Sequence, residues 1–368
     1  MKEIRIIVSG GGTGGHIFPA ISIANALKAK NPDSVKILFV GAEGRMEMER
    51  VPAAGYEIIG LPIRGFDRAH LLNNIKTLYM VLKSMVKARR IVKSFKPQVA
   101  VGVGGYASGP LLRAAAALGV PTVIQEQNSY AGVTNKLLAA KAAKICVAYS
   151  GMERFFPKEK ILLTGNPVRQ DLLEGDNLRQ KGQEFYKLDP NKKTLLIIGG
   201  SLGARTINES VMDYLDELEA AEDVQVIWQT GKYYYKQLIQ RLNGRELNNI
   251  QVLEFVNKMN FAYAAADLII SRAGASSISE LCLLQKAVIL VPSPNVAEDH
   301  QTKNALALVE KDAAEVISDL KARKDLIPKA LDLIHQPEKL KTLRVNIFKL
   351  AQQNSAARIA DEIFKLIK

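Results

Sequence analysis

The chain has 368 residues, of which 48% are hydrophobic and 24% charged, which argues against a disordered protein and allows two α/β domains. Its two cysteines lie far apart with no C-x-x-C pair, which argues for buried thiols and against a disulfide or metal site. The formal net charge of +13 indicates an anionic partner: nucleic acid, an acidic membrane surface or a phosphorylated substrate.

The N-terminal segment favours a cytosolic location. Glycine follows the first apolar run too soon for the core of a signal peptide, and no apolar stretch approaches the roughly 18 residues that span a bilayer. We therefore expect a protein that is cytosolic or lies on a membrane without crossing it.

Short β-branched runs alternate with helical patterns in the first half of the chain, which predicts a parallel sheet of βαβ units. The expected strands are Ile4–Val8, Lys36–Val40, Val99–Val103, Thr122–Gln125 and Ile145–Ala148. A helix is expected over Pro19–Lys30. Each strand ends at glycine or polar residues, where ligands bind in such sheets.

The first strand runs into Gly10-Gly11-Gly12-Thr13-Gly14-Gly15-His16, which has the spacing G-x-G-x-x-G. A dinucleotide site would add an acid after the second strand, here Glu43. The continuation His16-Ile17-Phe18-Pro19 favours another ligand, because it puts an imidazole at the mouth of the turn and a proline in the first helical turn. Backbone N–H groups at such a turn can face an anion or a sugar. A tight turn without a ligand is the alternative.

His16 is one of only four histidines and is the candidate general base. It follows a strand and is predicted to lie beside exposed backbone, and an imidazole can take the proton of an attacking hydroxyl. The alternatives are that it orients the substrate or fixes the loop.

Between Arg64 and Lys96 there are nine basic residues and one acid, Asp67. On a helical wheel over Leu71–Arg90, one stripe holds Leu71, Ile75, Leu78, Leu82, Met85 and Val86, and another face holds Lys76, Lys83, Lys87 and Arg90. The stripe could pack on the core beneath a solvated basic face. The surplus of basic residues favours an element on an anionic membrane surface, and no nucleic-acid motif accompanies it.

The pattern of strand, glycine turn and helix restarts in the second half, which predicts a second Rossmann-like domain. Thr194–Ile198 leads to Gly199-Gly200-Ser201-Leu202-Gly203-Ala204 and a helix from about Thr206. Further strands are expected at Gln225–Gln229, Gln251–Leu253, Leu268–Ser271 and Val288–Val291. The predicted domains are 1–166 and 167–345, and the helical tail 346–368 is expected to pack back on the first.

Three features of the second half suit a phosphorylated ligand. The turn at Ser201 can hold a diphosphate, and Arg169 can add a charge-assisted contact unless it is a surface arginine of a linker. Glu280 can accept hydrogen bonds from ribose hydroxyls, or it can form a capping box with Ser277. The polar segment 298–304 could grip sugar hydroxyls or be solvated.

The chain contains no Asp-x-Asp pair. Transferases that hold a donor diphosphate through a divalent metal usually need such paired carboxylates, so no metal cofactor is expected. A leaving diphosphate would be stabilised by a helix dipole, hydroxyls and arginine.

Six segments, in this order, together resemble the peptidoglycan N-acetylglucosaminyltransferases over essentially the whole chain. They are Gly11-Gly12-Thr13-Gly14-Gly15-His16-Ile17-Phe18-Pro19, Gly104-Gly105-Tyr106-Ala107-Ser108-Gly109-Pro110, Glu126-Gln127-Asn128, Gly165-Asn166-Pro167-Val168-Arg169, Gly199-Gly200-Ser201-Leu202-Gly203-Ala204 and Arg272-Ala273-Gly274. The resemblance implies a GT-B fold, in which two Rossmann-like domains with parallel sheets face a central cleft.

The resemblance also implies the reaction. Members of this family are inverting enzymes that move N-acetylglucosamine from UDP-N-acetylglucosamine to the muramyl 4-hydroxyl of lipid I, a polyprenyl-diphosphate muramyl peptide, and so form lipid II. The expected location is the cytoplasmic face of the cell membrane, held peripherally through the basic helix near Leu71–Arg90, with no nucleic-acid partner.

The resemblance carries substrate contacts onto matching residues of this sequence. Donor contacts fall on Thr13, Gly14, Gly15, Asn128, Arg169, Ser201, Val256, Gly274, Ala275, Ser276, Ser277, Ile278, Ser279, Glu280 and Gln301. Gly104 and Gly105 would face the acceptor diphosphate. Two departures stand out: 275–279 differs from the small-residue–Leu–Thr pattern of the family, and His300 precedes Gln301 where some relatives carry glutamine.

Two other functions stay open on the sequence. One is a GT-B relative with another acceptor, or an epimerase acting on the same sugar nucleotide. The other is a basic nucleotide- or nucleic-acid-binding protein without catalysis, for which DNA binding with a steep salt dependence would be the sign.

Overall fold

The structure is a computed structural model that describes residues 3–65, 74–168, 172, 175–296 and 299–367. The chain divides into two compact units, one formed by Met1–Arg169 with Gln352–Lys368 and the other by Gln170–Ala351. The sequence-based boundaries lie after residues 166 and 345. Of the predicted tail 346–368, the part from Gln352 onward belongs to the first unit.

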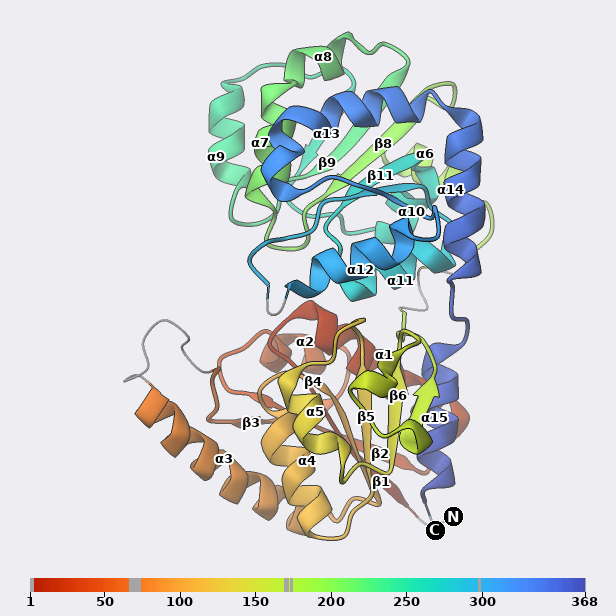
Figure 1. Ribbon diagram of the computed structural model, residues 1–368. Coiled ribbons are helices and arrows are strands. Elements are labelled where there is room, and N and C mark those ends of the chain that lie inside the picture. Colours follow the sequence, from red (N-terminus) through yellow and green to blue (C-terminus); the bar gives the residue numbers. More distant parts are fainter. Residues whose placement is uncertain (1–2, 66–73, 169–171, 173–174, 297–298, 368) are drawn as a thin grey trace. The chain divides into compact units, whose positions relative to one another are not determined.

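The first unit is built on a seven-stranded sheet in the order β3-β2-β1-β4-β5-β6-β7 (Figure 1). Its strands are β1 (Ile4–Gly10), β2 (Val35–Ala42), β3 (Glu57–Leu61), β4 (Val99–Gly104), β5 (Thr122–Glu126), β6 (Lys144–Val147) and β7 (Ile161–Leu163). Every neighbouring pair is parallel. Because β1 and β4 are neighbours, the loops that follow them meet at the same edge of the sheet.

The helices of the first unit include one from the end of the chain. They are α1 (Gly14–Lys30), α2 (Glu47–Ala53), α3 (Asn74–Phe95), α4 (Ser108–Ala117), α5 (Val133–Ala139) and α15 (Ser355–Lys365). Ile359 and Ile363 of α15 are buried in one hydrophobic cluster with residues of α1 and β1. Asp361 also pairs with Lys30 of α1 at 2.7 Å, so α15 completes the core of this unit.

The second unit has a six-stranded parallel sheet in the order β10-β9-β8-β11-β12-β13. Its strands are β8 (Lys193–Ile198), β9 (Val224–Gln229), β10 (Ile250–Leu253), β11 (Leu268–Ser271), β12 (Val288–Leu290) and β13 (Glu315–Val316). Its helices are α6 (Leu178–Phe185), α7 (Arg205–Asp213), α8 (Leu215–Ala220), α9 (Tyr235–Leu242), α10 (Met259–Ala265), α11 (Ala275–Leu283), α12 (His300–Val309), α13 (Asp319–Ile334) and α14 (Pro337–Lys349). Both sheets follow the Rossmann strand order, which confirms the prediction of two Rossmann-like domains with parallel sheets.

Helix α1 begins earlier than the sequence predicts. Its first turn is closed by the N–H groups of His16 and Ile17, which donate to the Thr13 carbonyl at 3.1 and 3.2 Å. Thr13 is extended and is the N-cap, so the helix starts at Gly14. The prediction that Pro19 lies in the first helical turn is therefore wrong, because Pro19 is inside the helix. His16 instead occupies the first turn.

Helix α3 exposes three residues of the apolar stripe that the helical wheel identified. Leu78, Leu82 and Val86 are exposed to 56%, 58% and 54%. The face that packs on the unit is a different one, formed by Thr77, Ser84, Ala88, Ile91 and Val92. The interpretation that this stripe packs on the core is therefore wrong for these three residues. Leu71 lies outside the described residues, as do the side chains of Ile75 and Lys76.

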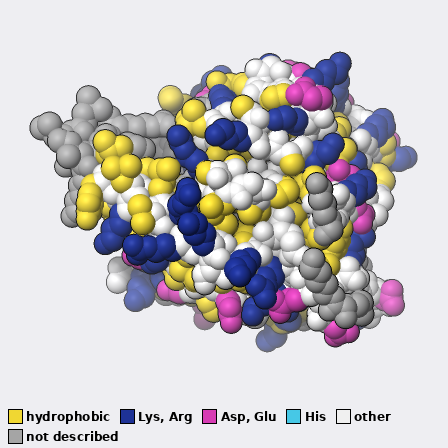
Figure 2. Space-filling view, turned by 90° about the horizontal axis from the view of Figure 1, so that it is seen from below, with side chains coloured by type: hydrophobic (Ala, Val, Ile, Leu, Met, Phe, Trp, Pro, Cys, Tyr) yellow, Lys and Arg dark blue, Asp and Glu magenta, His cyan; other side chains and the backbone are white. Residues whose placement is uncertain are grey.

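In the view of Figure 2, hydrophobic side chains lie together with Lys and Arg side chains at the left, over α3. Tyr79 joins the exposed apolar residues of the helix. Among the side chains of α3 that the structure describes, the exposed basic ones are Lys83, Arg89, Arg90 and Lys93. Helix α3 thus presents apolar and basic side chains on one solvent-facing surface.

Cys146 and Cys282 are free and buried, as predicted, and burial raises the pKa of both thiols to about 12. Among the described helices, none is both long enough and apolar enough to pass through a membrane.

Candidate active site

Two glycine loops of the first unit contact each other at the carboxyl ends of β1 and β4. Gly105 has a φ of +88°, and a Cβ there would collide with the carbonyl oxygen of Gly11. A Cβ at Gly104 would lie 2.5 Å from Cδ2 of His16. Glycine at both positions therefore allows the β4 loop to pack against the first loop and the imidazole.

The His16 ring is half-buried and held by its own loop. Its Nδ1 lies 3.1 Å from the Gly11 carbonyl oxygen. Because a carbonyl can only accept, this contact requires a proton on Nδ1, and in the neutral ring Nε2 then carries the lone pair. The geometry thus selects the tautomer in which Nε2 can accept a proton.

The predicted contacts Thr13, Gly14 and Gly15 lie at the start of α1. Thr13 and Gly15 are exposed and Gly14 is half-buried. Gly14 and Gly15 are the first two residues of the helix, where backbone N–H groups have no partner within the helix. This part of the loop is suited to an anionic or polar ligand.

Asn128 follows β5 in a loop that is organised by the buried carboxylate of Glu126. One oxygen of Glu126 accepts the Asn128 backbone N–H at 3.0 Å, and the other accepts the Gly132 N–H at 3.0 Å and Asn135 Nδ2 at 2.8 Å. The sequence placed Glu126 only in a family motif. Its role as the centre of this loop depends on bringing Gly132 and Asn135 together.

In the second unit, Ser201 lies exposed in the loop between β8 and α7. The buried side chain of Gln229, at the end of β9, connects this loop to the next predicted contact. Its Nε2 donates to the Gly200 carbonyl at 2.8 Å, and its Oε1 accepts the Val256 N–H at 3.1 Å. Val256 is buried, and its N–H is engaged by Gln229. Sequence reasoning did not identify Gln229.

Helix α11 begins at Ala275, and Gly274 is its N-cap. Ser277 and Glu280 therefore lie inside the helix, and the capping-box interpretation of this pair is wrong. The first turn presents the backbone of residues 275–277 at the carboxyl end of β11. The other predicted residues of the helix are buried or bonded within it: Ile278 is in the core, and the Ser279 hydroxyl donates to the Ala275 carbonyl at 3.0 Å. Ser276 is half-buried.

The Glu280 carboxylate is half-buried and accepts a hydrogen bond from Tyr263 of α10 at 3.1 Å. Tyr263 is almost completely buried, so its hydroxyl orients one carboxylate oxygen.

Gln301 lies in the first turn of α12, where its Oε1 accepts the Ser293 N–H at 2.9 Å. A sugar hydroxyl would thus meet its Nε2 donor. Arg169 and Glu298 lie outside the described residues. Glu43, the acid of the dinucleotide alternative, is exposed and pairs with Lys87 at 2.9 Å.

Arg272, from the Arg272-Ala273-Gly274 motif, has a structural role. Its Nη1 donates to the carbonyls of Val291 and Pro292 at 3.1 and 3.2 Å and to Asp319 at 2.5 Å. It joins the ends of β11 and β12 to the start of α13, and so supports the loop that precedes α11.

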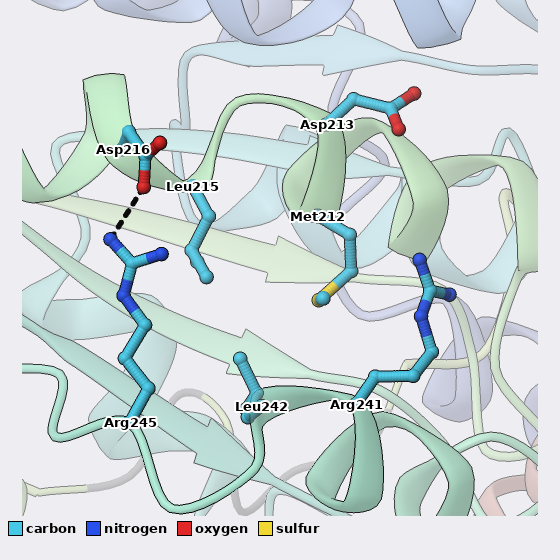
Figure 3. Close-up of a pocket in the computed structure, with 7 residues that line it drawn as sticks. All are labelled: Met212, Asp213, Leu215, Asp216, Arg241, Leu242 and Arg245. Carbon is cyan, nitrogen blue, oxygen red and sulfur yellow. Dashed lines mark hydrogen bonds and ion pairs between the residues drawn. The ribbon is translucent and has the colours of Figure 1, made fainter.

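A pocket of the second unit lies on α7, α8, α9 and the turn after α9 (Figure 3). It is lined by Met212, Asp213, Leu215, Asp216, Arg241, Leu242 and Arg245. Arg245 pairs with Asp216 at 2.5 Å and Arg241 pairs with Glu209 at 2.7 Å. Both arginines are thus engaged by carboxylates, and none of the predicted site residues lines this pocket.

Comparison with known proteins finds relatives along the whole chain. The model of the glycosyltransferase family 28 N-terminal domain matches residues 6–147, and that of the C-terminal domain matches residues 194–363. A Parabacteroides distasonis protein, named UDP-N-acetylglucosamine--N-acetylmuramyl-(pentapeptide) pyrophosphoryl-undecaprenol N-acetylglucosamine transferase, is 63% identical over 100% of this chain and 99% of its own length. A Porphyromonas gingivalis protein of the same name is 54% identical over 100% of this chain and 96% of its own length.

Solved structures extend the comparison to the fold. The crystal structure of Acinetobacter baumannii MurG matches with a TM-score of 0.77 and 28% identity, over 98% of this chain and 99% of that chain. A UDP-GlcNAc 2-epimerase from Neisseria meningitidis matches with a TM-score of 0.71 over 98% of this chain and 100% of that chain, but at 14% identity it shows a similar fold only. The matches confirm the predicted GT-B fold class.

Proposed function

The chain belongs to glycosyltransferase family 28, and on that premise we propose that it moves N-acetylglucosamine from UDP-N-acetylglucosamine to the muramyl 4-hydroxyl of lipid I. The product is lipid II, a precursor of peptidoglycan. The observation that carries the proposal is the 63% sequence identity, over the whole chain, to a transferase named for this donor and this acceptor.

The chemistry is a displacement at the anomeric carbon of the donor sugar. The acceptor hydroxyl oxygen bonds to that carbon, the bond from the carbon to the diphosphate oxygen breaks with inversion, and UDP leaves. The hydroxyl proton passes to Nε2 of His16, whose Nδ1 already donates to Gly11. The acceptor diphosphate binds at the glycine loops of the first unit, with Gly104 and Gly105 facing it.

The donor binds to the second unit. The Ser201 loop and the first turn of α11 hold the diphosphate, and Glu280 accepts hydrogen bonds from the ribose. The Val256 carbonyl meets the uracil and Gln301 donates to the sugar. Support comes from their shared position at the carboxyl edge of one parallel sheet. From the first unit, Thr13, Gly14, Gly15 and Asn128 contact the donor sugar, and Arg169 contacts the diphosphate.

The donor diphosphate is held without a divalent metal. The support is the absence of an Asp-x-Asp pair from the sequence, together with a hydroxyl and helix N-terminal N–H groups at the proposed site. These groups would stabilise the charge that develops on the leaving UDP.

A transfer assay tests the function directly. Protein supplied with UDP-N-acetylglucosamine and a lipid I analogue is expected to form the disaccharide product, and EDTA is expected to change the rate by less than about twofold. Release of UDP without a disaccharide would favour an epimerase instead. A protein that binds DNA with a steep salt dependence but does not bind UDP would contradict the enzymatic function.

Helix α3 attaches the protein to the cytoplasmic face of the cell membrane. Its exposed residues Leu78, Leu82 and Val86 would enter the interface between headgroups and acyl chains. Exposed basic residues of the same helix would each contribute about 1 kcal/mol of attraction to anionic lipid. An anionic membrane would therefore be the partner of the basic residues in this stretch, and a nucleic-acid partner is not needed to explain them.

The substitution Leu82→Glu is expected to weaken binding to vesicles that contain phosphatidylglycerol by about tenfold or more. It removes an exposed leucine side chain that the membrane would bury, and it adds an anion. Co-sedimentation measures the effect. Leu320→Glu is the matched control, since Leu320 of α13 is 95% exposed and lies in the other unit. Equal binding of the two variants would rule out α3 as the attachment site.

A further inference from the structure

Glu47 is a buried carboxylate beside the first glycine loop, and none of the roles described above includes it. It is the first residue of α2 and is 1% exposed. Its Oε2 accepts the Gly12 backbone N–H at 2.9 Å, and its Oε1 accepts the Ala42 N–H at 3.0 Å. Both oxygens therefore act as acceptors, as in an ionised carboxylate.

Two glycines leave room for this side chain. A Cβ at Gly11 would collide with Oε1 of Glu47, and a Cβ at Gly41 would lie 2.6 Å from its Cγ. The end of β2 and the first loop thus both lack side chains where they face Glu47. The carboxylate fills a space that only glycine leaves open.

The same peptide group contacts Glu47 and His16. The Gly12 N–H, which donates to Glu47, and the Gly11 carbonyl, which accepts from His16 Nδ1 at 3.1 Å, belong to one peptide unit. The sequence of contacts is therefore carboxylate, peptide N–H, peptide carbonyl, imidazole. From this geometry we infer that Glu47 is a positioning residue that sets the tautomer and orientation of His16 through the Gly11–Gly12 peptide.

The physical effect has two parts. First, the carboxylate fixes the plane of the peptide, so that the Gly11 carbonyl points at Nδ1. Second, a negative charge on the N–H side polarises the peptide and makes its carbonyl a stronger acceptor, because hydrogen bonds in series reinforce one another. Both effects keep the proton on Nδ1 and leave Nε2 to accept a proton. A carboxylate that bonds directly to a catalytic histidine acts in the same way.

Glutamine in place of Glu47 is the informative substitution. It has nearly the same shape, but its side chain presents one acceptor and one NH₂ group. One of the two backbone N–H groups, from Gly12 or Ala42, would then face a donor. The hold on the peptide weakens and the charge disappears, while the packing around the side chain is retained.

The first test is the tautomer of His16, read from nitrogen-15 NMR of histidine-labelled protein at a pH where the imidazoles are neutral. The chain has four histidines, and the His16→Ala spectrum assigns the signal. Wild-type protein is expected to show the Nδ1–H tautomer. This measurement does not depend on the folding of any variant. Glu47→Gln is expected to raise the Nε2–H population. An Nε2–H tautomer in the wild type, or no change in Glu47→Gln, would overturn the inference.

The second test is kinetic and rests on the proposed function. Glu47→Gln is expected to lower kcat by about 10–100-fold, the loss typical when a group that orients a functional histidine is removed. The KM for UDP-N-acetylglucosamine is expected to stay within about twofold. Glu49→Gln is the control, since Glu49 is exposed on the same helix. If His16→Ala were fully active, the base role would fail, but the NMR result would still decide the role of Glu47.

Discussion

The substitution His16→Ala is expected to lower kcat by about 10²–10⁴-fold, the contribution typical of a general base. The reason is that Nδ1 is committed to the Gly11 carbonyl, so Nε2 is the nitrogen that takes the proton of the acceptor hydroxyl. Because His16 is assigned to proton transfer and not to a donor contact, the KM for UDP-N-acetylglucosamine is expected to change by no more than about twofold.

Steady-state rates of disaccharide formation measure this effect, with each substrate varied in turn. His335→Ala is the matched control, because His335 lies in the second unit and bonds to Asp223 at 2.7 Å, outside the proposed site. Turnover of His16→Ala within a few-fold of wild type would show that His16 only orients the substrate or the loop.

Glu280→Ala is expected to weaken UDP binding by about 10–100-fold, because a hydrogen bond to a charged group contributes about 1.5–3 kcal/mol. The substitution removes the carboxylate that Tyr263 orients toward the proposed ribose site. The rate at saturating donor is expected to change much less, since the ribose lies away from the reacting carbon.

Calorimetric titration with UDP separates this binding effect from catalysis. Glu217→Ala is the control, because Glu217 is an exposed glutamate on α8 of the same unit. Undiminished UDP affinity in Glu280→Ala would remove the ribose assignment and leave Glu280 as a partner of Tyr263 only.

Most of the fold could be predicted from sequence, because it follows from local patterns. Strands β1, β4, β8 and β11 are β-branched or aliphatic runs. Strands β8 and β11 end at the predicted residues, whereas β1 and β4 continue to Gly10 and Gly104. Glycines mark the turns after β1 and β8 for a local reason, since those turns need backbone that side chains would block. Short strands such as β7 and β13 were missed, because two or three residues carry no detectable period.

The candidate site was predictable in its loops but not in the groups that hold them. Glu47 and Gln229 each contact a glycine loop that is distant in sequence, and Tyr263 contacts Glu280 of helix α11. No spacing rule connects these pairs. The capping-box interpretation of Ser277 and Glu280 was wrong for a related reason. The pattern fits a helix that starts after Ser277, but the N-cap is Gly274 and the helix begins at Ala275.

The sequence by itself determined the two Rossmann-like units, the glycine turns at Gly10–Gly15 and Gly199–Gly203, and His16 at the first of them. These features depend on residues close together along the chain. The tertiary structure alone decided that Leu78, Leu82 and Val86 of α3 face solvent and that Glu47 reaches His16 through one peptide group. Burial and hydrogen-bond partners depend on which distant segments meet when the sheet forms, and a linear pattern does not contain that information.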